Sequence, residues 1–470
     1  HAVHAAKSAT VGAPSTAIGA RARAAWQAGQ AHARRGAWAE AVRCFETASR
    51  QAPHDAAIAL NLSRALMAQR RCDDAAREAA RAFQLDPRDI VACAYTAHCL
   101  MAGKRFRDAA RCLQSLPADV ERGHDYHYTL GLALQHGGQP REAVEAYMNA
   151  LALRITDANT HYQLGLCLNE LSMKAEAAQC FQTALSMGVG PHELGVRALL
   201  AYFERDVCQW AGAQQGLGEM QRLLDELPDD ACVATAPFAH VTLMDDPADQ
   251  LKAARSLARH LAMQARPFPA RRSDWRPDGG RRLRVGYLSA DFHEHATCIL
   301  MAEMLEHHDR GRFEVTLYSH GKDDGSAMRR RIVQACEHFV ELRGQSDGDI
   351  ARRIRDDGCD LLIDLKGYTR NHRVGALAWR PAPVTATFLG FPGSTGADYI
   401  DYLIGDPVVT PLDHAPCYSE QLAQMPVCYQ PNDRQRALPA PPSRAEAGLP
   451  EGALVLAGFN QPYKISAAVF

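Results

Sequence analysis

A repeat of 34 residues constrains the first part of the chain more than any other feature. One position of the repeat is large in most copies, and successive copies place there Phe45, Ala79, Leu113, Tyr147 and Phe181. The spacing predicts units of two antiparallel helices, with small residues such as Gly131 and Gly165 at the close crossing and the large residues between neighbouring units. A proline such as Pro53 ends the second helix, because it has no amide donor. One unit cannot bury its own apolar face, so the units must stack into an α-solenoid.

This pattern resembles the tetratricopeptide repeat. About five copies extend over residues 22–187, after an N-terminal tail of residues 1–21. The resemblance implies a curved array whose concave groove binds a peptide or a protein. The alternative is that the repeats only support the next domain or form a homodimer.

The composition indicates a folded protein with several domains. At roughly 100–200 residues per domain, 470 residues make about three. The net charge of −2 excludes a strongly basic nucleic-acid binder and a strongly acidic disordered chain. None of the 14 cysteines forms a Cys-x-x-Cys pair, which favours reduced thiols over zinc sites. No apolar run approaches the ~18 residues of a membrane helix and residues 1–20 have no signal-peptide core, so we expect a cytoplasmic protein without membrane partners.

Between the repeats and the second half of the chain the sequence predicts a connector and a linker. The 34-residue register is lost near Gly188, and helical patterning continues to about residue 265. Residues 266–280 contain three prolines and a Gly pair, which indicate a linker. Its arginines are better explained by solvation than by a polyanion site, since the chain is close to neutral.

After residue 280 short apolar runs alternate with helices. Strands are predicted for residues 283–289, 313–318, 338–342, 359–365, 384–389 and 402–404, and helices for 297–307, 326–336 and 349–356. Such alternation predicts a parallel sheet with right-handed crossovers, whose ligands bind beyond the carboxyl ends of the strands. Polar loops follow three of these strands, at residues 291–298, 366–372 and 390–398, so we expect one site at that edge.

Two common nucleotide-binding motifs are missing from the sequence. The first strand is not followed by Gly-x-Gly-x-x-Gly, and Gly-x-x-x-x-Gly-Lys-Ser/Thr occurs nowhere, which disfavours a dehydrogenase and a P-loop phosphotransferase. The pair His293 and His295 is compatible with a metal ligand set, but no further acidic or histidine cluster at helical spacing supports one. A metal site is therefore not expected.

Several motifs together resemble one enzyme family. In chain order they are Arg284-Val-Gly-Tyr-Leu-Ser-Ala-Asp-Phe-His-Glu-His, Asp323-Asp-Gly, Gly367-Tyr-Thr, Leu377-Ala-Trp-Arg-Pro-Ala-Pro-Val, Leu389-Gly-Phe-Pro-Gly-Ser-Thr-Gly and Phe459-Asn-Gln-Pro-Tyr-Lys-Ile. Their order and spacing resemble the O-linked N-acetylglucosamine transferases, glycosyltransferase family 41, which includes the SPINDLY-like proteins. The resemblance covers the chain from about residue 22.

The resemblance implies a GT-B type glycosyltransferase with two Rossmann-like lobes and its site between them. Residues 281–440 correspond to the first lobe, and residues 441–470 to the start of the second, nucleotide-sugar-binding lobe, with residues 454–460 as its first strand. Such an enzyme transfers a sugar from a nucleotide sugar to Ser or Thr of a protein, with inversion and without a metal or other cofactor. The donor implied is uridine diphosphate N-acetylglucosamine (UDP-GlcNAc).

The same resemblance implies roles for individual residues. His295 matches the histidine that has been proposed as the general base, a role that suits an imidazole. Here Ala296 replaces the family's proline and Ile299 a frequent second histidine. Positions that match the nucleotide-binding residues are Gln461 and Lys464, and positions that match the loop near the sugar and acceptor are Pro392, Gly393 and Thr395.

In the family, many repeats carry an asparagine that lines the groove. The matching positions of this chain are Gln27, Asn61, Tyr95, Thr129 and Gln163. Only Asn61 keeps the residue type, so the same grip on a peptide backbone is not assumed.

Three hypotheses follow from the motifs. The first is transfer of N-acetylglucosamine to proteins, and the second is a SPINDLY-like protein O-fucosyltransferase that uses GDP-fucose. The third is a scaffold whose repeats bind partners without catalysis. Because a Rossmann-like lobe needs several strand–helix units, we expect the chain to be a fragment that lacks most of its donor-binding lobe and is inactive on its own.

Overall fold

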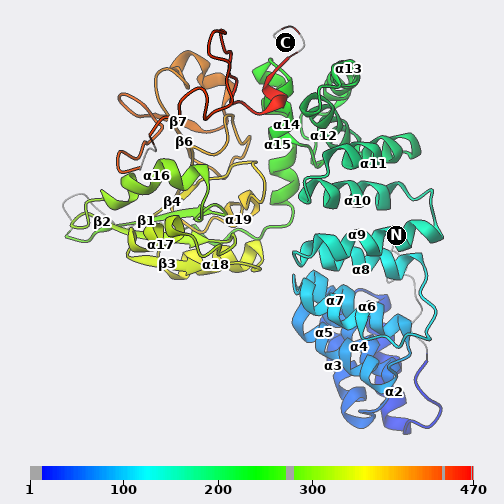
Figure 1. Ribbon diagram of the computed structural model, residues 1–470. Coiled ribbons are helices and arrows are strands. Elements are labelled where there is room, and N and C mark those ends of the chain that lie inside the picture. The colour runs from blue at the N-terminus through cyan, green and yellow to red at the C-terminus, as the bar shows by residue number, and fades with distance from the viewer. Residues whose placement is uncertain (1–12, 271–279, 437–439, 467, 469–470) are drawn as a thin grey trace. The chain divides into compact units, whose positions relative to one another are not determined.

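The computed structural model describes residues 13–270, 280–436, 440–466 and 468 (Figure 1). The chain divides into two compact units, one ending at Val189 and the other beginning at Gly190. Each unit is described by itself.

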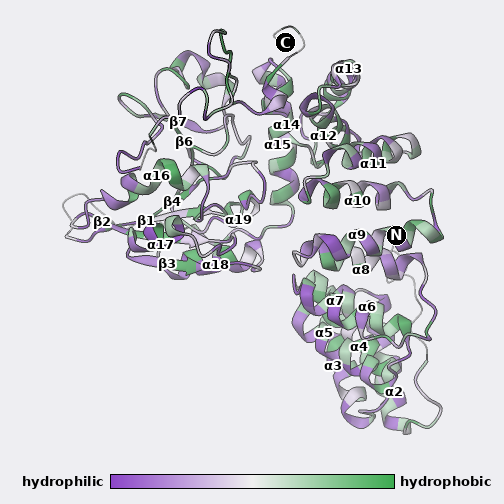
Figure 2. Cartoon of the chain, viewed as in Figure 1, coloured by the Kyte–Doolittle hydropathy of each residue, from purple (hydrophilic) through white to green (hydrophobic). Residues whose placement is uncertain are grey.

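In its described residues the first unit is a series of five antiparallel helix pairs (Figure 1). The pairs are α2 (Ala20–Arg34) with α3 (Trp38–Gln51), α4 (Ala56–Ala68) with α5 (Cys72–Leu85), α6 (Ile90–Ala102) with α7 (Phe106–Gln114), α8 (His124–His136) with α9 (Pro140–Leu153), and α10 (Ala158–Glu170) with α11 (Lys174–Met187). Hydrophobic and hydrophilic residues alternate along these helices, as Figure 2 shows. The predicted solenoid of two-helix repeats is confirmed.

Aspartates at the 34-residue spacing start three of these pairs. Asp55, Asp89 and Asp157 each accept a hydrogen bond from a backbone N–H in the first turn of the following helix, at 2.8–2.9 Å. The remaining position of this series, between Asp89 and Asp157, is Gly123 at the start of α8. A carboxylate at the N-cap satisfies a backbone donor that has no partner inside the helix, so it fixes where each repeat begins.

A glycine facing an aromatic ring sets the distance between the helices in three of the pairs. A Cβ added to Gly131 would lie 2.5 Å from the ring of Tyr147, and one added to Gly165 would lie 2.7 Å from Phe181. The same relation joins Gly29 to Phe45 in the first pair, at 2.7 Å. The sequence places these rings between neighbouring units, whereas the structure places their edges against the glycine of their own unit. Each ring therefore fits only because the residue facing it in the other helix of its pair is a glycine.

The second unit begins with the short 3-10 helix η1 (Gly190–His192), and four α-helices follow it before the described part of the sheet lobe. They are α12 (Glu193–Asp206), α13 (Trp210–Glu226), α14 (Pro237–Leu243) and α15 (Pro247–Ala262). Leu194 of α12 packs with Met220 and Leu224 of α13 and with Ala253 of α15 in a common core. This segment corresponds to the predicted helical connector.

A parallel sheet, with seven strands among the described residues, forms the centre of the second unit. The strands are β1 (Leu283–Ser289), β2 (Phe313–Ser319), β3 (His338–Glu341), β4 (Leu361–Asp364), β5 (Val384–Phe388), β6 (Tyr402–Gly405) and β7 (Gln421–Gln424). Their order is β3-β2-β1-β4-β5-β6-β7, so the chain reverses its direction of progress between β1 and β4. That reversal is the topological switch point, where open α/β sheets bind ligands.

Helices bury both faces of this sheet. They are α16 (Ala296–Glu306), α17 (Ala327–Gln334), α18 (Asp347–Asp356) and α19 (Val374–Leu377). Met301 of α16 shares a core with Val285 of β1 on one face. On the other face Leu288 of β1 packs with Ile350 of α18 and with Leu257 of α15. The last connector helix is thus part of the core of the lobe.

Most of the predicted strands and helices of this lobe are confirmed, and two expectations fail. The strand β7 is missing from the prediction, since Gln421–Gln424 is short and polar and forms by pairing with β6. Residues 454–460 are not a strand, and Leu454, Leu456 and Phe459 are 88%, 89% and 99% exposed. An apolar run becomes a strand only when another strand pairs with it, and none does so among the described residues.

Residues 266–270 of the predicted linker lie against the lobe, and residues 271–279 are outside the described residues. Phe268 donates its backbone N–H to the carbonyl of Trp379 at 2.9 Å, and their rings lie 5.7 Å apart. None of the helices among the described residues combines the length and the apolar character that a membrane span requires.

Gly131→Ala should destabilise the protein, because the new Cβ has to displace the buried ring of Tyr147. We expect a loss of about 1–3 kcal/mol in the free energy of unfolding, measured by urea denaturation. The matched control is Gly218→Ala in the middle of α13, where a Cβ meets nothing within 4 Å. The control should gain up to about 1 kcal/mol from helix propensity. Equal effects of the two substitutions would contradict the close crossing.

Candidate active site

The loop after β1 carries the first group of polar side chains at the carboxyl edge of the sheet. Asp291 is buried there, its backbone N–H donating to Ser289 Oγ at 3.0 Å. His295 ends the loop as the N-cap of α16, where its Nδ1 accepts the backbone N–H of Thr297 at 3.2 Å. The loop thus presents an imidazole at the switch point of the sheet.

The loop after β4 brings a lysine to the same place. The Nζ of Lys366 lies 2.6 Å from Asp291 Oδ2, and their side chains are 6% and 9% exposed. The same Oδ2 lies 3.7 Å from His295 Nδ1. The first two predicted polar loops therefore meet, joined by a buried ion pair between β1 and β4.

His295 is held as a neutral imidazole. Its side chain is 42% exposed, so it can reach a ligand. Burial of the ring lowers the pKa of His295, the Asp291 carboxylate opposes that effect, and the charges of Lys366 and His293 lower the pKa further. The balance keeps the ring uncharged at neutral pH.

Three further buried groups lie close to these loops and were not recognised in the sequence. Asp364 ends β4 and is fully buried; Gly367 N–H donates to its Oδ2 at 2.6 Å, and its Oδ1 has no hydrogen-bond partner among the described residues. His320 follows β2 and His372 lies on the loop after β4; each has one ring nitrogen buried without a partner among those residues. Buried polar atoms without partners are the ones that a ligand or an ordered water satisfies.

The pKa values of these three groups point to a site kept free of excess charge. Burial raises the pKa of Asp364 to about 7, and hydrogen bonds from the backbone N–H groups of Gly367 and Lys366 oppose that rise. Burial lowers the pKa of His320 to about 3, and burial lowers the pKa of His372 to about 4. Near neutral pH both imidazoles are therefore neutral, beside the buried ion pair of Lys366 and Asp291.

A buried arginine, also unrecognised in the sequence, ties the loop after β1 to the neighbouring strands. Arg329 of α17 donates to the carbonyl of Phe292 at 2.8 Å, and its guanidinium lies 4.8 Å from the ring centre of Phe339 in β3. Its charge is paired with Asp323 and Glu341. The motif Asp323-Asp-Gly thus supports the loop that ends at His295, since Asp324 also accepts the backbone N–H of Glu294 at 3.0 Å.

The third predicted polar loop, after β5, is anchored by a buried glutamate. Glu420 is 5% exposed and accepts hydrogen bonds from Ser394 Oγ and from Thr395 N, both at 2.7 Å, and from the Thr395 hydroxyl. Tyr368 donates its hydroxyl to the carbonyl of Thr395 at 2.7 Å, which joins this loop to the one after β4. Thr395 therefore points into the protein and shapes the loop.

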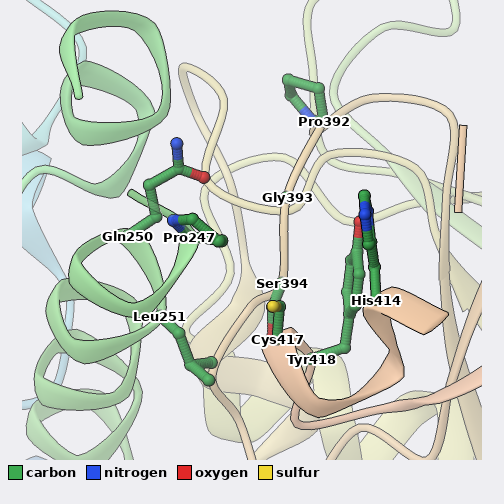
Figure 3. A pocket seen from close by; sticks show the side chains of 9 residues that line it. All are labelled: Pro247, Gln250, Leu251, Pro392, Gly393, Ser394, His414, Cys417 and Tyr418. Carbon is green, nitrogen blue, oxygen red and sulfur yellow. The ribbon is translucent and has the colours of Figure 1, made fainter. Parts of the chain in front are cut away.

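Pro392 and Gly393, by contrast, line a small cavity (Figure 3). Across from them lie Gln250 and Leu251 of α15, and the 3-10 helix η2 (Leu412–Cys417) contributes His414 and Cys417, with Tyr418 just after it. The cavity measures about 110 Å³. Pockets for drug-sized ligands measure about 300–1,000 Å³, so this one holds a group of a few atoms and not a whole sugar.

The two predicted nucleotide-binding residues lie on a different element. Gln461 and Lys464 are exposed at the 3-10 helix η3 (Pro462–Lys464). Between them Tyr463 packs on Tyr202 of α12, with ring centres 4.9 Å apart, and on Phe238 of α14 at 6.3 Å. Tyr463 therefore anchors this short segment, while the amide and the ammonium beside it face solvent.

No group of three or more His, Cys, Asp or Glu side chains suited to a metal ion is found among the described residues. The rings of His293 and His295 lie 5.6 Å apart at 70° to each other. His293 Nδ1 lies 3.8 Å from Asp324.

In the repeats, the one asparagine of the expected groove series is turned into its own helix. Asn61 is 8% exposed and donates its amide to the carbonyl of Ala57 at 2.7 Å. Thr129 of α8 likewise donates its hydroxyl within its helix, to the carbonyl of Asp125 at 2.7 Å. An asparagine grip on a peptide backbone is therefore not formed by Asn61 as it stands.

A pocket of about 280 Å³ lies where the third repeat has its short second helix. There α7 has 9 residues, whereas α9 in the next pair has 14. Lining residues include Arg122, whose Nε is buried without a hydrogen-bond partner in the described residues, and His127, whose Nδ1 is equally unpaired. Glu142 and Glu145 of α9 line the same pocket.

Comparison with known proteins finds similarities in both parts of the chain. Residues 252–440 match the family described as Glycosyl transferase family 41, and residues 20–90 and 66–130 match tetratricopeptide repeat families. Residues 252–440 are thus similar to glycosyltransferase family 41. The matched segment holds the three polar loops and begins inside α15, the helix that shares the core of the lobe.

Relatives with assigned names cover parts of the chain. An Arabidopsis thaliana protein named probable UDP-N-acetylglucosamine–peptide N-acetylglucosaminyltransferase SEC is 33% identical over 273 residues, which is 55% of this chain and 28% of the relative. A Caenorhabditis elegans protein named UDP-N-acetylglucosamine–peptide N-acetylglucosaminyltransferase is 36% identical over 160 residues, 34% of this chain and 14% of the relative. A SPINDLY protein of Arabidopsis thaliana is 33% identical over 198 residues, 41% and 21% respectively. The chain thus spans less than a third of the length of each of these relatives.

Among solved structures, a mutant of the Thermobaculum terrenum O-GlcNAc transferase aligns with 97% of this chain and 66% of its own. The sequence identity is 22% and the TM-score is 0.40.

Glu420→Ala should loosen the loop that contains Pro392 and Gly393. It removes the carboxylate acceptor of three buried donors on Ser394 and Thr395, so we expect a loss of about 2–4 kcal/mol in the free energy of unfolding. Hydrogen exchange of the amides of residues 394–397 should accelerate. The control is Glu294→Ala, at an exposed carboxylate, which should stay within about 0.5 kcal/mol of the parent. Unchanged exchange in Glu420→Ala would disprove the anchor.

Asp364 should make stability fall as the pH rises from about 4 to about 7. Its pKa is raised in the folded state, so the folded protein binds a proton that the unfolded chain releases in this range. Asp364→Asn stays neutral and should lose this dependence. Its free energy of unfolding relative to the parent should therefore rise by about 1.4 kcal/mol for each pH unit within that range. Urea denaturation at pH 5 and pH 8 measures the difference, and a constant difference would show that Asp364 titrates normally.

Proposed function

We propose that this chain is part of an inverting glycosyltransferase that moves N-acetylglucosamine from UDP-GlcNAc to Ser or Thr of proteins. The observation that carries the proposal is the segment similar to family 41, whose polar loops meet at the carboxyl edge of the sheet. The names of the SEC and Caenorhabditis elegans relatives support this donor. The activity requires neither a metal nor another cofactor, in keeping with the family.

The residues divide the work between two places. His295 reaches the site as a neutral imidazole, and Pro392 and Gly393 give the loop near the sugar and acceptor its close backbone approach, while Thr395 fixes that loop through Glu420. Gln461 and Lys464 bind the nucleotide. The ammonium of Lys464 offsets the charge that develops on the leaving diphosphate, which is a large contribution in a site that excludes water.

The repeats present the acceptor protein. The pocket between α7, α8 and α9 supports this role, since it offers donors at Arg122 and acceptors at Glu142 and Glu145 to a polypeptide. The same array is also the surface through which a homodimer would form. All 14 cysteines are free, which supports a cytoplasmic location.

Donor binding tests the proposal directly. Isothermal titration of the complete protein should show binding of UDP-GlcNAc in preference to GDP-fucose, and Lys464→Ala should weaken it about tenfold or more. That loss equals about 1.4 kcal/mol, a modest value for a charge-assisted contact. The control is Lys322→Ala, at an exposed lysine after β2, which should bind as the parent does.

The other outcomes decide between the remaining hypotheses. Preference for GDP-fucose would overturn the donor and favour the SPINDLY-like fucosyltransferase. Binding of neither donor would favour a repeat scaffold. Unchanged binding in Lys464→Ala would remove that residue from the donor site.

A further inference from the structure

One carboxylate oxygen lies between two basic side chains at the switch point of the sheet. Asp291 Oδ2 is 2.6 Å from Lys366 Nζ and 3.7 Å from His295 Nδ1. The shorter distance is a charged hydrogen bond, and the longer one is beyond hydrogen-bonding range. Lys366 therefore occupies the oxygen that would otherwise be the partner of the imidazole.

The imidazole meanwhile uses the same nitrogen for another purpose. His295 Nδ1 accepts the backbone N–H of Thr297 at 3.2 Å, as the N-cap of α16. A nitrogen that accepts a hydrogen bond cannot carry a proton, so the proton of the neutral ring is on Nε2. The Thr297 hydroxyl lies 3.2 Å from the same Nδ1 and is able to donate to it as well.

Burial decides that Asp291 pairs with Lys366 and not with His295. Lys366 and Asp291 are 6% and 9% exposed, so neither charge can exchange its partner for water. Breaking such a pair leaves an unpaired buried charge, whereas His295 is partly exposed and has an alternative partner in the helix end. Lys366 therefore stays paired with the Asp291 carboxylate, and His295 accepts a hydrogen bond from the backbone N–H of Thr297.

We propose that Lys366 is a positioning residue that withholds Asp291 from His295, so that His295 stays neutral and offers an Nε2–H donor to the ligand. The chemical consequence is that His295 donates a hydrogen bond, for example to an oxygen of the sugar or the acceptor, and does not begin the reaction as a base at Nε2. This role rests on the proposed function, whereas the protonation state itself does not. In the absence of Lys366, Asp291 accepts a hydrogen bond from Nδ1–H and leaves Nε2 free as a base, as in an Asp–His pair.

The other groups facing the ring favour the same state. His293 lies 5.6 Å away ring to ring on the same loop, and its charge opposes a charge on His295. From β4 and its loop only Lys366 adds to this effect among the described residues, and Asp291 alone acts in the opposite direction. Removal of the lysine should therefore shift the balance toward the carboxylate.

Nitrogen NMR of the ligand-free protein with 15N-labelled histidine tests the proposal without any donor or acceptor. The resonances of His295 are assigned by their loss in His295→Gln. In the parent at neutral pH we expect a neutral ring with the proton on Nε2 and an unprotonated Nδ1. A proton on Nδ1 in the parent would overturn the proposal.

Two variants test the cause. In Lys366→Met the proton of His295 should move to Nδ1 and its pKa should rise by about one or more, since an opposite charge at this distance typically changes a pKa by about 1–3. Lys322→Met, at an exposed lysine on the same edge of the sheet, should leave both unchanged. An unaltered tautomer and pKa in a folded Lys366→Met would disprove the role of the lysine.

If Lys366→Met does not fold, Asp291→Asn supplies the second test. It removes the carboxylate and keeps the lysine, so the tautomer should stay the same and the pKa of His295 should fall. A rise in that pKa, or a proton on Nδ1, would refute the proposed competition. Failure of donor binding, by contrast, would refute the proposed function and leave these results intact.

Discussion

In a parallel sheet that is covered on both faces, polar side chains are placed at the ends of the strands. Here α16 and α17 cover one face, and α15, α18 and α19 cover the other, so the strand interiors hold apolar residues such as Val285 and Leu288. The ionisable groups Asp291, Lys366 and Asp364 then meet at one edge, because β1 and β4 are neighbours although 75 residues separate Asp291 from Lys366. The fold thus determines which charged groups must pair, because water has too little access to solvate them separately.

The periodic parts of this architecture are predictable from the sequence. The 34-residue spacing predicts the helix pairs, because each repeat places small and large residues at the same positions in order to pack in the same way. The alternation of apolar runs and helices predicts six of the seven strands, because a strand buried on both faces leaves a continuous apolar run. β7 has no such run, and the residues 454–460 have one without a pairing strand among the residues that the structure describes.

The sequence predicts that the polar loops lie at one edge of the sheet, but it does not predict how their side chains pair. Strand ends and motif resemblance point to His295, Pro392 and Gly393. They do not reveal that Lys366 pairs with Asp291, that Glu420 holds Thr395, or that burial raises the pKa of Asp364, because each of these depends on burial and on partners distant along the chain. Loop geometry likewise decides which nitrogen of a histidine accepts a hydrogen bond, and no sequence pattern carries that information.

The packing of α15 in the core of the lobe limits where the coding sequence can recombine without disrupting the fold. Its residues Ala254, Leu257 and Ala258 belong to the core of the lobe, and Tyr399 donates its hydroxyl to the carbonyl of Ala258 at 3.2 Å. A genetic exchange at the Pro-rich stretch after residue 265 would divide one hydrophobic core between two parents. The unit that can be shuffled between proteins therefore begins at or before Pro247, and the visible linker is not the boundary at which the chain can be recombined.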